Sequence, residues 1–261
     1  VPAGDIGVGG REIGYLYGQY KRLRQFDAGV LTGKPLGFGG SLIRPEATGY
    51  GLVYFTDNML AANGKSFKDQ TVLISGSGNV AQYAVQKAAE LGAKVISVSD
   101  SNGYIIDETG IDFDLLVDIK EKRRARLTEY AAEKPTAKYF EGSVWNYDGK
   151  ADIALPCATQ NEINGEQAAA LVKNGVYCVA EGANMPSDLG AIKVYKENGV
   201  LYGLAKAANA GGVAVSALEM SQNSLRLSWT REEVDGRLKD IMANIFNTAK
   251  ETAEKYDLGK D

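Results

Sequence analysis

The sequence predicts an α/β protein built on a doubly wound, mostly parallel sheet. Short aliphatic and β-branched runs alternate with helical patterns of about 10 to 15 residues, as expected when crossover helices join parallel strands. The chain also holds 31 glycines in 261 residues, about 12% against a usual value of roughly 7%, clustered between apolar runs. One cluster joins the first apolar run directly to an amphipathic helix, which favours a tight turn and close backbone approach to a ligand.

Two helices are predicted before the first strand. Residues 11–26 carry apolar side chains at helical spacing, and a short extended run should follow at residues 30–32. The second helix should begin at Pro45 and end at Asn63–Gly64, because proline suits a first helical turn and glycine ends helices.

From residue 71 onward, strands and helices should alternate. Continuous apolar runs predict strands at residues 71–75, 94–99, 152–155, 177–180 and 200–203. Helical spacing predicts a helix that Gly92 ends, further helices at residues 115–132, 165–173 and 189–197, and a mostly helical stretch at residues 217–256.

Composition limits the chemistry. Histidine is absent, which excludes imidazole bases, Ser/His/Asp and Cys/His pairs and His-ligated zinc, and leaves carboxylates, lysines and tyrosines for proton transfer. Cys157 and Cys178 are 21 positions apart without CxxC spacing, so we expect buried thiols in a reducing compartment and no metal site.

Charge and hydropathy argue against large polyanionic or lipid partners. The net charge is −4, so no general nucleic-acid or membrane surface is expected. No run approaches about 18 consecutive apolar residues, and the first residues lack the pattern of a signal peptide. We therefore expect a cytoplasmic protein.

Three glycine clusters resemble a dinucleotide fingerprint, but only one has the right context. In residues 7–14 and 37–42 the third small position carries Glu12 and Leu42, and no apolar strand precedes either cluster. The run GSGNVA at residues 76–81 follows the strand TVLIS and opens an amphipathic helix. Gly76 and Gly78 should therefore let the backbone around Val80 approach a pyrophosphate in a Rossmann-like fold, with the anion at the helix N-terminus.

The next strand ends at Asp100, where a carboxylate would meet the adenosine ribose and favour NAD. Ser101 leaves space for a phosphate, and Arg123 belongs to a basic run that could hold the 2′-phosphate of NADP or form a solvated helix face. We expect NADP, with NAD as the alternative. Neutralising Arg123 and Arg124 should then weaken NADPH binding more than NADH binding.

Six blocks in order carry a family resemblance. They are VPAGDIGVGGREIG from Val1, GGSLIRPEATGYG from Gly39, SGSGNVAQYA from Ser75, LPCATQNE from Leu155, AEGANMP from Ala180, and KAANAGGV with SALEMSQN from Lys206. The chain resembles, over nearly its whole length, the coenzyme-binding domain of hexameric bacterial-type glutamate dehydrogenases. The run KRRAR at residues 122–126 resembles the NADP-using members.

The resemblance implies reversible oxidative deamination of L-glutamate to 2-oxoglutarate and ammonia by a homo-hexamer. It implies that Asp5 is the catalytic carboxylate that shuttles protons to and from the amino group. It further implies substrate contacts from Gly4, Asn209 and Ser216, and coenzyme contacts from Thr48, Asn79, Ala158, Thr159, Asn184 and Asn209.

The resemblance also divides the chain. Residues 1–43 should be a strip of the substrate domain with a cleft loop, and residues 44–261 the dinucleotide-binding domain with its C-terminal helices. In this family the catalytic lysine segment lies upstream of the position of Val1, and neither Lys34 nor Lys206 replaces it by motif. We therefore expect a fragment that binds nucleotide without turnover. Leu204–Ala205 departs from the proline and small residue common in relatives.

Two alternatives stay open. One is a related dehydrogenase for branched-chain or aromatic amino acids, against which Ser216 argues, because a hydroxyl beside an aliphatic substrate would be unpaired at a cost of about 1 to 3 kcal/mol. The other is a non-catalytic nucleotide-binding module.

Overall fold

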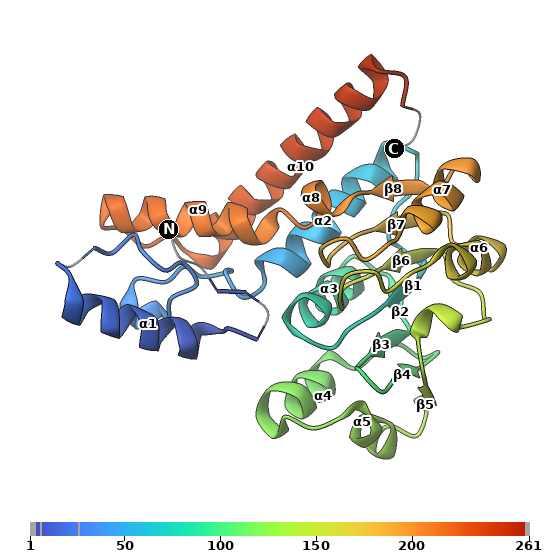
Figure 1. Ribbon diagram of the computed structural model, residues 1–261, viewed down its shortest axis with the longest axis horizontal. Helices are drawn as coiled ribbons and strands as arrows, with labels where there is room; N and C mark the ends of the chain where they lie inside the picture. Colours follow the sequence, from blue (N-terminus) through green and yellow to red (C-terminus); the bar gives the residue numbers. More distant parts are fainter. Residues whose placement is uncertain (1–3, 6, 26, 259–261) are drawn as a thin grey trace.

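The computed structural model describes residues 4–5, 7–25 and 27–258, and it has the expected α/β architecture (Figure 1). Its main sheet has five parallel strands in the order β2-β1-β6-β7-β8. The strands are β1 (Thr71–Ile74), β2 (Lys94–Val95), β6 (Ile153–Leu155), β7 (Cys178–Ala180) and β8 (Leu201–Gly203). The chain leaves β1 toward β2 on one side and later returns to β6 on the other, so the sheet is doubly wound.

Helices cover both faces of this sheet (Figure 1). Alternate strand residues point to opposite faces, so Val72 and Ile74 join one core cluster and Leu73 joins the other. The first cluster contains side chains of α2 (Ala47–Ala61), α3 (Asn79–Glu90) and α10 (Arg231–Lys255). The second contains side chains of α6 (Gly165–Lys173) and α7 (Leu189–Glu197), whose bounds match the sequence prediction. Cys157 and Cys178 are buried free thiols, as expected.

The prediction of one strand at residues 94–99 was wrong, because these residues are divided between two sheets. β2 ends at Val95, whereas β3 (Ser97–Ser99) pairs antiparallel with β4 (Gly103–Ile106), which pairs with β5 (Lys138–Glu141). The Ser97 hydroxyl accepts the Ile74 N–H at 2.9 Å and donates to the Ile74 carbonyl at 3.0 Å. The Ser97 hydroxyl thus takes the place of the main-chain hydrogen bonds that would continue the pairing of β2 with β1, and the chain leaves the parallel sheet at this point.

The single helix predicted at residues 115–132 was also wrong. The structure has α4 (Phe113–Val117), a π-helical segment η2 (Asp118–Arg123) and α5 (Leu127–Glu133). Between the last two, Arg124 adopts a left-handed conformation with φ of 55°. The Ala125 N–H donates to the Ile119 carbonyl at 2.9 Å, and the Lys120 ammonium donates to the Ala125 carbonyl at 3.0 Å. These bonds close a turn that contains no glycine or proline to signal it.

The N-terminal strip forms a small unit beside the C-terminal helices. Helix α1 (Gly10–Leu23) buries Ile13 and Tyr17 against Leu31 in a cluster separate from the main core. Leu31 has φ of 57°, so the extended run predicted at residues 30–32 does not form a strand. The remaining elements are η1 (Leu36–Phe38), η3 (Val144–Asn146), α8 (Ala205–Ala208) and α9 (Gly211–Leu225).

A buried ion pair attaches this strip to α9. The Lys34 ammonium lies 2.6 Å from a Glu219 carboxylate oxygen, and both side chains are fully buried. Glu219 also accepts the Gly33 N–H at 2.9 Å. Lys34 is therefore a structural residue in the described part of the chain, consistent with its lack of a catalytic motif.

Candidate functional site

The predicted glycine turn lies where the strand order reverses. β2 and β6 flank β1 on opposite sides, so the loops after β1 and β6 border the crevice in which open α/β sheets bind ligands. Gly76 has φ of 83°, and a Cβ added to it would lie 2.9 Å from the Cys157 carbonyl oxygen in the loop after β6. Glycine is required here for its backbone conformation and for the close approach of the two loops.

Two serine side chains, Ser99 on β3 and Ser75 directly after β1, fix the turn. The Gly76 N–H donates to Ser99 Oγ at 2.7 Å, and the Ser99 N–H donates to the Gly76 carbonyl at 3.1 Å. On the other side, the Cys157 N–H donates to Ser75 Oγ at 2.9 Å. The turn is therefore fixed before any ligand binds.

Gly78 opens the N-terminus of α3. It is the N-cap residue, with φ of −85° and no side-chain cap hydrogen bond. Gly78 and Asn79 are exposed, and no described atom within 4 Å would meet a Cβ added to Gly78. The first N–H groups of a helix have no intrahelical partner, so this open end suits an anion. The residues present thus fit the pyrophosphate of a dinucleotide.

The predicted ribose carboxylate, Asp100, is held by main-chain donors. Oδ1 accepts the N–H groups of Asn102 and Gly103 at 2.9 and 3.3 Å, and Oδ2 accepts that of Leu127 at 3.1 Å. Burial of the carboxyl raises its pKa, but these hydrogen bonds together outweigh burial and hold the pKa below its ordinary value. Asp100 therefore stays ionised and anchors the start of α5.

Two arginines of the basic run have different partners. Arg126 Nη1 donates to Ser101 Oγ at 2.8 Å, which places this guanidinium beside the residue after Asp100. Arg123 instead pairs with Glu133 and with Asp118, and these two carboxylates raise its pKa. Position within the basic run could not distinguish the two, because the left-handed break at residue 124 reorients the chain between them.

The loop after β6 is supported by Glu162. One carboxylate oxygen accepts the N–H groups of Ala158 and Thr159 at 3.1 and 3.2 Å, and the other accepts the Trp145 indole N–H at 2.8 Å. Burial raises the pKa of Glu162, although these hydrogen bonds oppose the rise. Ala158 and Thr159, both predicted to contact the coenzyme, thus lie in the loop that closely approaches Gly76.

Asn184 and Asn209 come from different loops and contact each other. The Asn209 side-chain N–H donates to Asn184 Oδ1 at 2.8 Å. Asn184 follows β7 and is exposed, and Asn209 is the C-cap residue of α8. The structure therefore brings together two site residues that lie 25 positions apart in the sequence.

Another group of predicted site residues lies where the start of α9 packs against α2. A Cβ on Gly212 would lie 2.4 Å from Thr48 Oγ1, so only glycine permits this contact. Arg44 Nε donates to Ser216 Oγ at 2.9 Å. Burial lowers the pKa of Arg44, and the negative charge of Glu219 partly opposes this shift. Arg44 and Gly212 were not predicted as site residues, although both lie in blocks that support the family resemblance. Arg44 is the first residue of RPEATG, and Gly212 is the second glycine of the pair in KAANAGGV.

Gly4 and Asp5 lie before α1 and are exposed. The Asp5 carbonyl accepts the Val8 N–H at 2.9 Å, and a Cβ on Gly4 would lie 3.0 Å from Val8 Cγ1. These contacts bring Gly4 and Asp5 close to Val8. The role of Asp5 stays a prediction.

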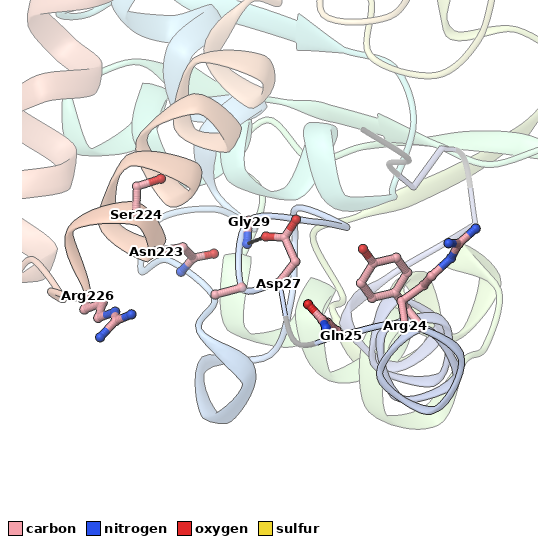
Figure 2. A pocket seen from close by; sticks show the side chains of 9 residues that line it. Arg24, Gln25, Asp27, Gly29, Asn223, Ser224 and Arg226 are labelled. Carbon is pink, nitrogen blue, oxygen red and sulfur yellow. Dashed lines mark hydrogen bonds between the residues drawn. The ribbon is translucent and has the colours of Figure 1, made fainter.

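An open hollow lies away from the glycine turn. It has a volume of about 680 Å³ between the end of α1 and the end of α9, and its lining includes Tyr20, Arg24, Asp27, Asn223 and Arg226. Figure 2 shows its side chains widely spaced around an open space, with Asp27 accepting the Gly29 N–H. None of the predicted site residues lines this hollow. The crevice at the glycine turn therefore remains the better candidate for chemistry.

Two kinds of feature are absent from the described residues. Within residues 4–5, 7–25 and 27–258, no three Cys, Asp or Glu side chains gather as metal ligands would. Within the same ranges, every helix is too short or too polar to cross a bilayer.

Comparison with known proteins finds relatives that match most of the chain. The family model Glutamate/Leucine/Phenylalanine/Valine dehydrogenase matches residues 39–259. The NADP-specific glutamate dehydrogenase of Giardia intestinalis is 56% identical over 98% of the chain and 58% of its own length. For the NADP-specific glutamate dehydrogenase of Escherichia coli (strain K12), the identity is 54%, over 96% of the chain and 56% of its own length.

A solved structure is similar over the same extent. The glutamate dehydrogenase of Plasmodium falciparum superposes with a TM-score of 0.95 at 52% identity, covering 99% of this chain and 56% of its own. The chain thus spans a little over half the length of these relatives. The family model covers most of the chain and these relatives are more than half identical to it, so the chain belongs to the Glutamate/Leucine/Phenylalanine/Valine dehydrogenases.

Proposed function

We propose that this chain provides the coenzyme-binding part of a glutamate dehydrogenase that uses NADP in preference to NAD. The reaction is the reversible oxidative deamination of L-glutamate to 2-oxoglutarate and ammonia. The observation that carries the proposal is the glycine turn at the switch point, where Gly78 leaves the N-terminus of α3 open beside the loop after β6. The names of the relatives from Giardia and Escherichia support both the substrate and the coenzyme.

The crevice offers contacts along the length of a dinucleotide. Gly76, Gly78, Asn79 and Val80 would hold the pyrophosphate at the start of α3, and the Ala158–Thr159 loop would form the opposite wall. The Asn184–Asn209 pair and Thr48 would hold the nicotinamide half. When bound, NADP supplies the acceptor for the hydride of the substrate α-carbon.

Arg126 is the residue that we assign to the 2′-phosphate. It is already oriented beside Ser101, whereas Arg123 is occupied by Glu133 and Asp118. Asp100 uses both of its oxygens for main-chain donors, which leaves less capacity for the ribose hydroxyls that NAD presents.

Alanine variants of the two arginines test this assignment. Arg126→Ala should weaken NADPH binding roughly tenfold or more, because a charge-assisted hydrogen bond contributes about 1.5 to 3 kcal/mol, and should leave NADH binding unchanged. The sequence predicted that neutralising Arg123 weakens NADPH binding, but Glu133 and Asp118 occupy its guanidinium in the structure. Arg123→Ala is therefore the matched control and should change neither affinity. Equal effects of the two variants on NADPH, measured by fluorescence titration, would contradict the assignment.

Substrate chemistry would use residues at the edge of the crevice. Asp5 would move a proton to and from the amino group, a role that a carboxylate can take in a chain without histidine. Gly4 and Asn209 would contact the α-amino-acid end of the substrate. Ser216, held by the buried guanidinium of Arg44, would bind the side-chain carboxylate.

Two measurements test the proposal. Titration of the 261-residue chain should give a lower Kd for NADPH than for NADH, and binding of neither would contradict it. In the enzyme that contains this chain, L-glutamate should be oxidised faster than L-leucine. Faster leucine turnover would instead support the branched-chain alternative, and nucleotide binding without any amino-acid oxidation would support the non-catalytic module.

Assembly and location extend the same proposal. The resemblance to hexameric bacterial-type enzymes supports a homo-hexamer in the cytoplasm. Sedimentation of the enzyme at the mass of a single subunit would contradict the hexamer.

A further inference from the structure

A buried glutamate joins the two loops that carry the asparagine pair. Glu181 directly follows β7 and is only 2% exposed. Its N–H donates to the Gly203 carbonyl at 3.0 Å, which fixes its main chain between β7 and β8. The side chain is therefore attached at the edge of the sheet where the parallel strands have their carboxyl ends, and it is buried there.

Each carboxylate oxygen of Glu181 accepts a hydrogen bond from a different loop. Oε1 accepts the Ser187 N–H at 3.3 Å, at the end of the loop that contains Asn184. Oε2 accepts the N–H of Ala205 at 2.9 Å, the first residue of the short helix that ends at Asn209. The loops are thus joined at their base by a carboxylate and at their open end by the two asparagines.

The chemistry of the donors explains why a carboxylate stands here. Both partners are main-chain N–H groups, so the side chain must offer an acceptor in two directions at once. A carboxylate offers acceptors only, whereas a glutamine would turn an NH₂ group toward one of the donors. A buried acceptor that leaves a donor unpaired is costly, so substitution should shift one loop away from the other.

We propose that Glu181 is a positioning residue that sets the separation of these two loops and so aligns Asn184 and Asn209 for the nicotinamide half of the coenzyme. This inference rests on the proposed function of the same crevice. Glu181 itself lies beneath the surface, so it acts through the two asparagines and not by contact with the ligand.

Two coenzyme probes test the inference. Glu181→Gln should weaken NADPH binding by the chain roughly tenfold. The variant should bind adenosine 2′,5′-bisphosphate, which lacks the nicotinamide half, as tightly as the unmodified chain. Equal weakening of both probes would indicate a general distortion and overturn the inference, as would unchanged NADPH binding.

A matched control separates positioning from stability. Asp107 is also a fully buried carboxylate and accepts the Thr109 N–H at 3.0 Å and the Thr136 hydroxyl at 3.0 Å, but it lies outside the crevice residues. Asp107→Asn should lower the denaturation midpoint as Glu181→Gln does, and should leave both probes unaffected. A loss of NADPH binding in this control would overturn the inference.

Coupling to Asn209 supplies a readout that a purely structural role would not change. Asn209→Ala should weaken NADPH binding in the unmodified chain but have little further effect in the Glu181→Gln background. Additive effects would overturn the inference. If Glu181→Gln does not fold, Glu181→Asp retains the charge but is too short to reach both donors, and the same pattern is expected. Failure of the unmodified chain to bind either probe would instead refute the proposed function on which the inference rests.

Discussion

Two glycines of the coenzyme turn should respond in opposite ways to the same added methyl group. Gly76 is confined by the neighbouring loop and by its own backbone conformation, whereas Gly78 is confined by neither. We predict that Gly76→Ala mainly lowers stability and that Gly78→Ala mainly lowers coenzyme affinity. The pair therefore separates the structural and the binding parts of one motif.

The size of the Gly76→Ala effect follows from two costs. With φ of 83°, an alanine is in the left-handed region, at about 1 to 2 kcal/mol. Its Cβ would also lie 2.9 Å from the Cys157 carbonyl oxygen and 3.2 Å from Ala158 Cα, so main chain must shift, at about 1 to 3 kcal/mol. The free energy of unfolding should fall by about 2 to 5 kcal/mol.

Gly78→Ala should have little effect on folding. Gly78 has φ of −85°, which alanine adopts readily, and no described atom within 4 Å meets the new Cβ. Alanine is a poorer N-cap than glycine, so a loss of about 0.5 to 1 kcal/mol is expected. The methyl group would however occupy the space in front of the first helical N–H groups, where close approach of a pyrophosphate is needed. NADPH affinity should fall at least roughly tenfold.

Urea denaturation and NADPH fluorescence titration of both variants measure the two quantities. Each variant serves as the control for the other, because the added group is the same. A Gly78→Ala variant that binds NADPH like the unmodified chain would refute the placement of the pyrophosphate. A Gly76→Ala variant of unchanged stability would refute the close approach of the loops after β1 and β6.

Three further predictions concern buried and partly buried charges. Lys34→Met should lower the free energy of unfolding by about 3 to 5 kcal/mol, because the Glu219 charge is left buried and unpaired; addition of Glu219→Gln should recover part of this loss in urea denaturation, and no recovery would contradict the explanation. The pKa of Asp100 is lower in the folded chain than in the unfolded chain, where it is about 3.9. The resulting contribution to the free energy of unfolding is therefore present above about pH 3.9 and is lost as the pH falls through the folded pKa. Asp100→Asn should therefore show a shallower acid loss of stability than the unmodified chain, and identical acid titrations would exclude this contribution. The pKa of Glu162 is raised, so its effect on stability has the opposite pH dependence. Its contribution to the free energy of unfolding is present below about pH 4.3 and is lost as the pH rises through the folded pKa. Glu162→Gln should remove that slope from denaturation midpoints measured across pH, and parallel curves for the two proteins would refute it.

The main sheet could be predicted because its elements are encoded locally. Continuous apolar runs marked β1, β6, β7 and β8, and helical spacing gave α6 and α7 with the bounds that the structure has. The antiparallel strands β4 and β5 were missed. β5 is mostly exposed and carries Lys138 and Glu141 at its ends, so it lacks the apolar run by which a strand is recognised.

The local sequence also located the glycine turn, since φ above zero at Gly76 and an open helix start at Gly78 depend on the residues themselves. It could not choose between Arg123 and Arg126. That choice depends on a left-handed break between them and on which carboxylates the fold brings near.

The amino-acid sequence alone therefore determined the strand–turn–helix unit, the absence of imidazole chemistry and the family. Only the tertiary structure decided which distant residues meet, such as Asn184 with Asn209 and Arg44 with Ser216. It also revealed the hydrogen bonds of Glu181, which lies in the block AEGANMP but was not predicted to be a site residue. The physical reason is that backbone conformation and periodicity are set by neighbours along the chain, whereas a hydrogen bond between loops depends on the order in which the sheet places its strands.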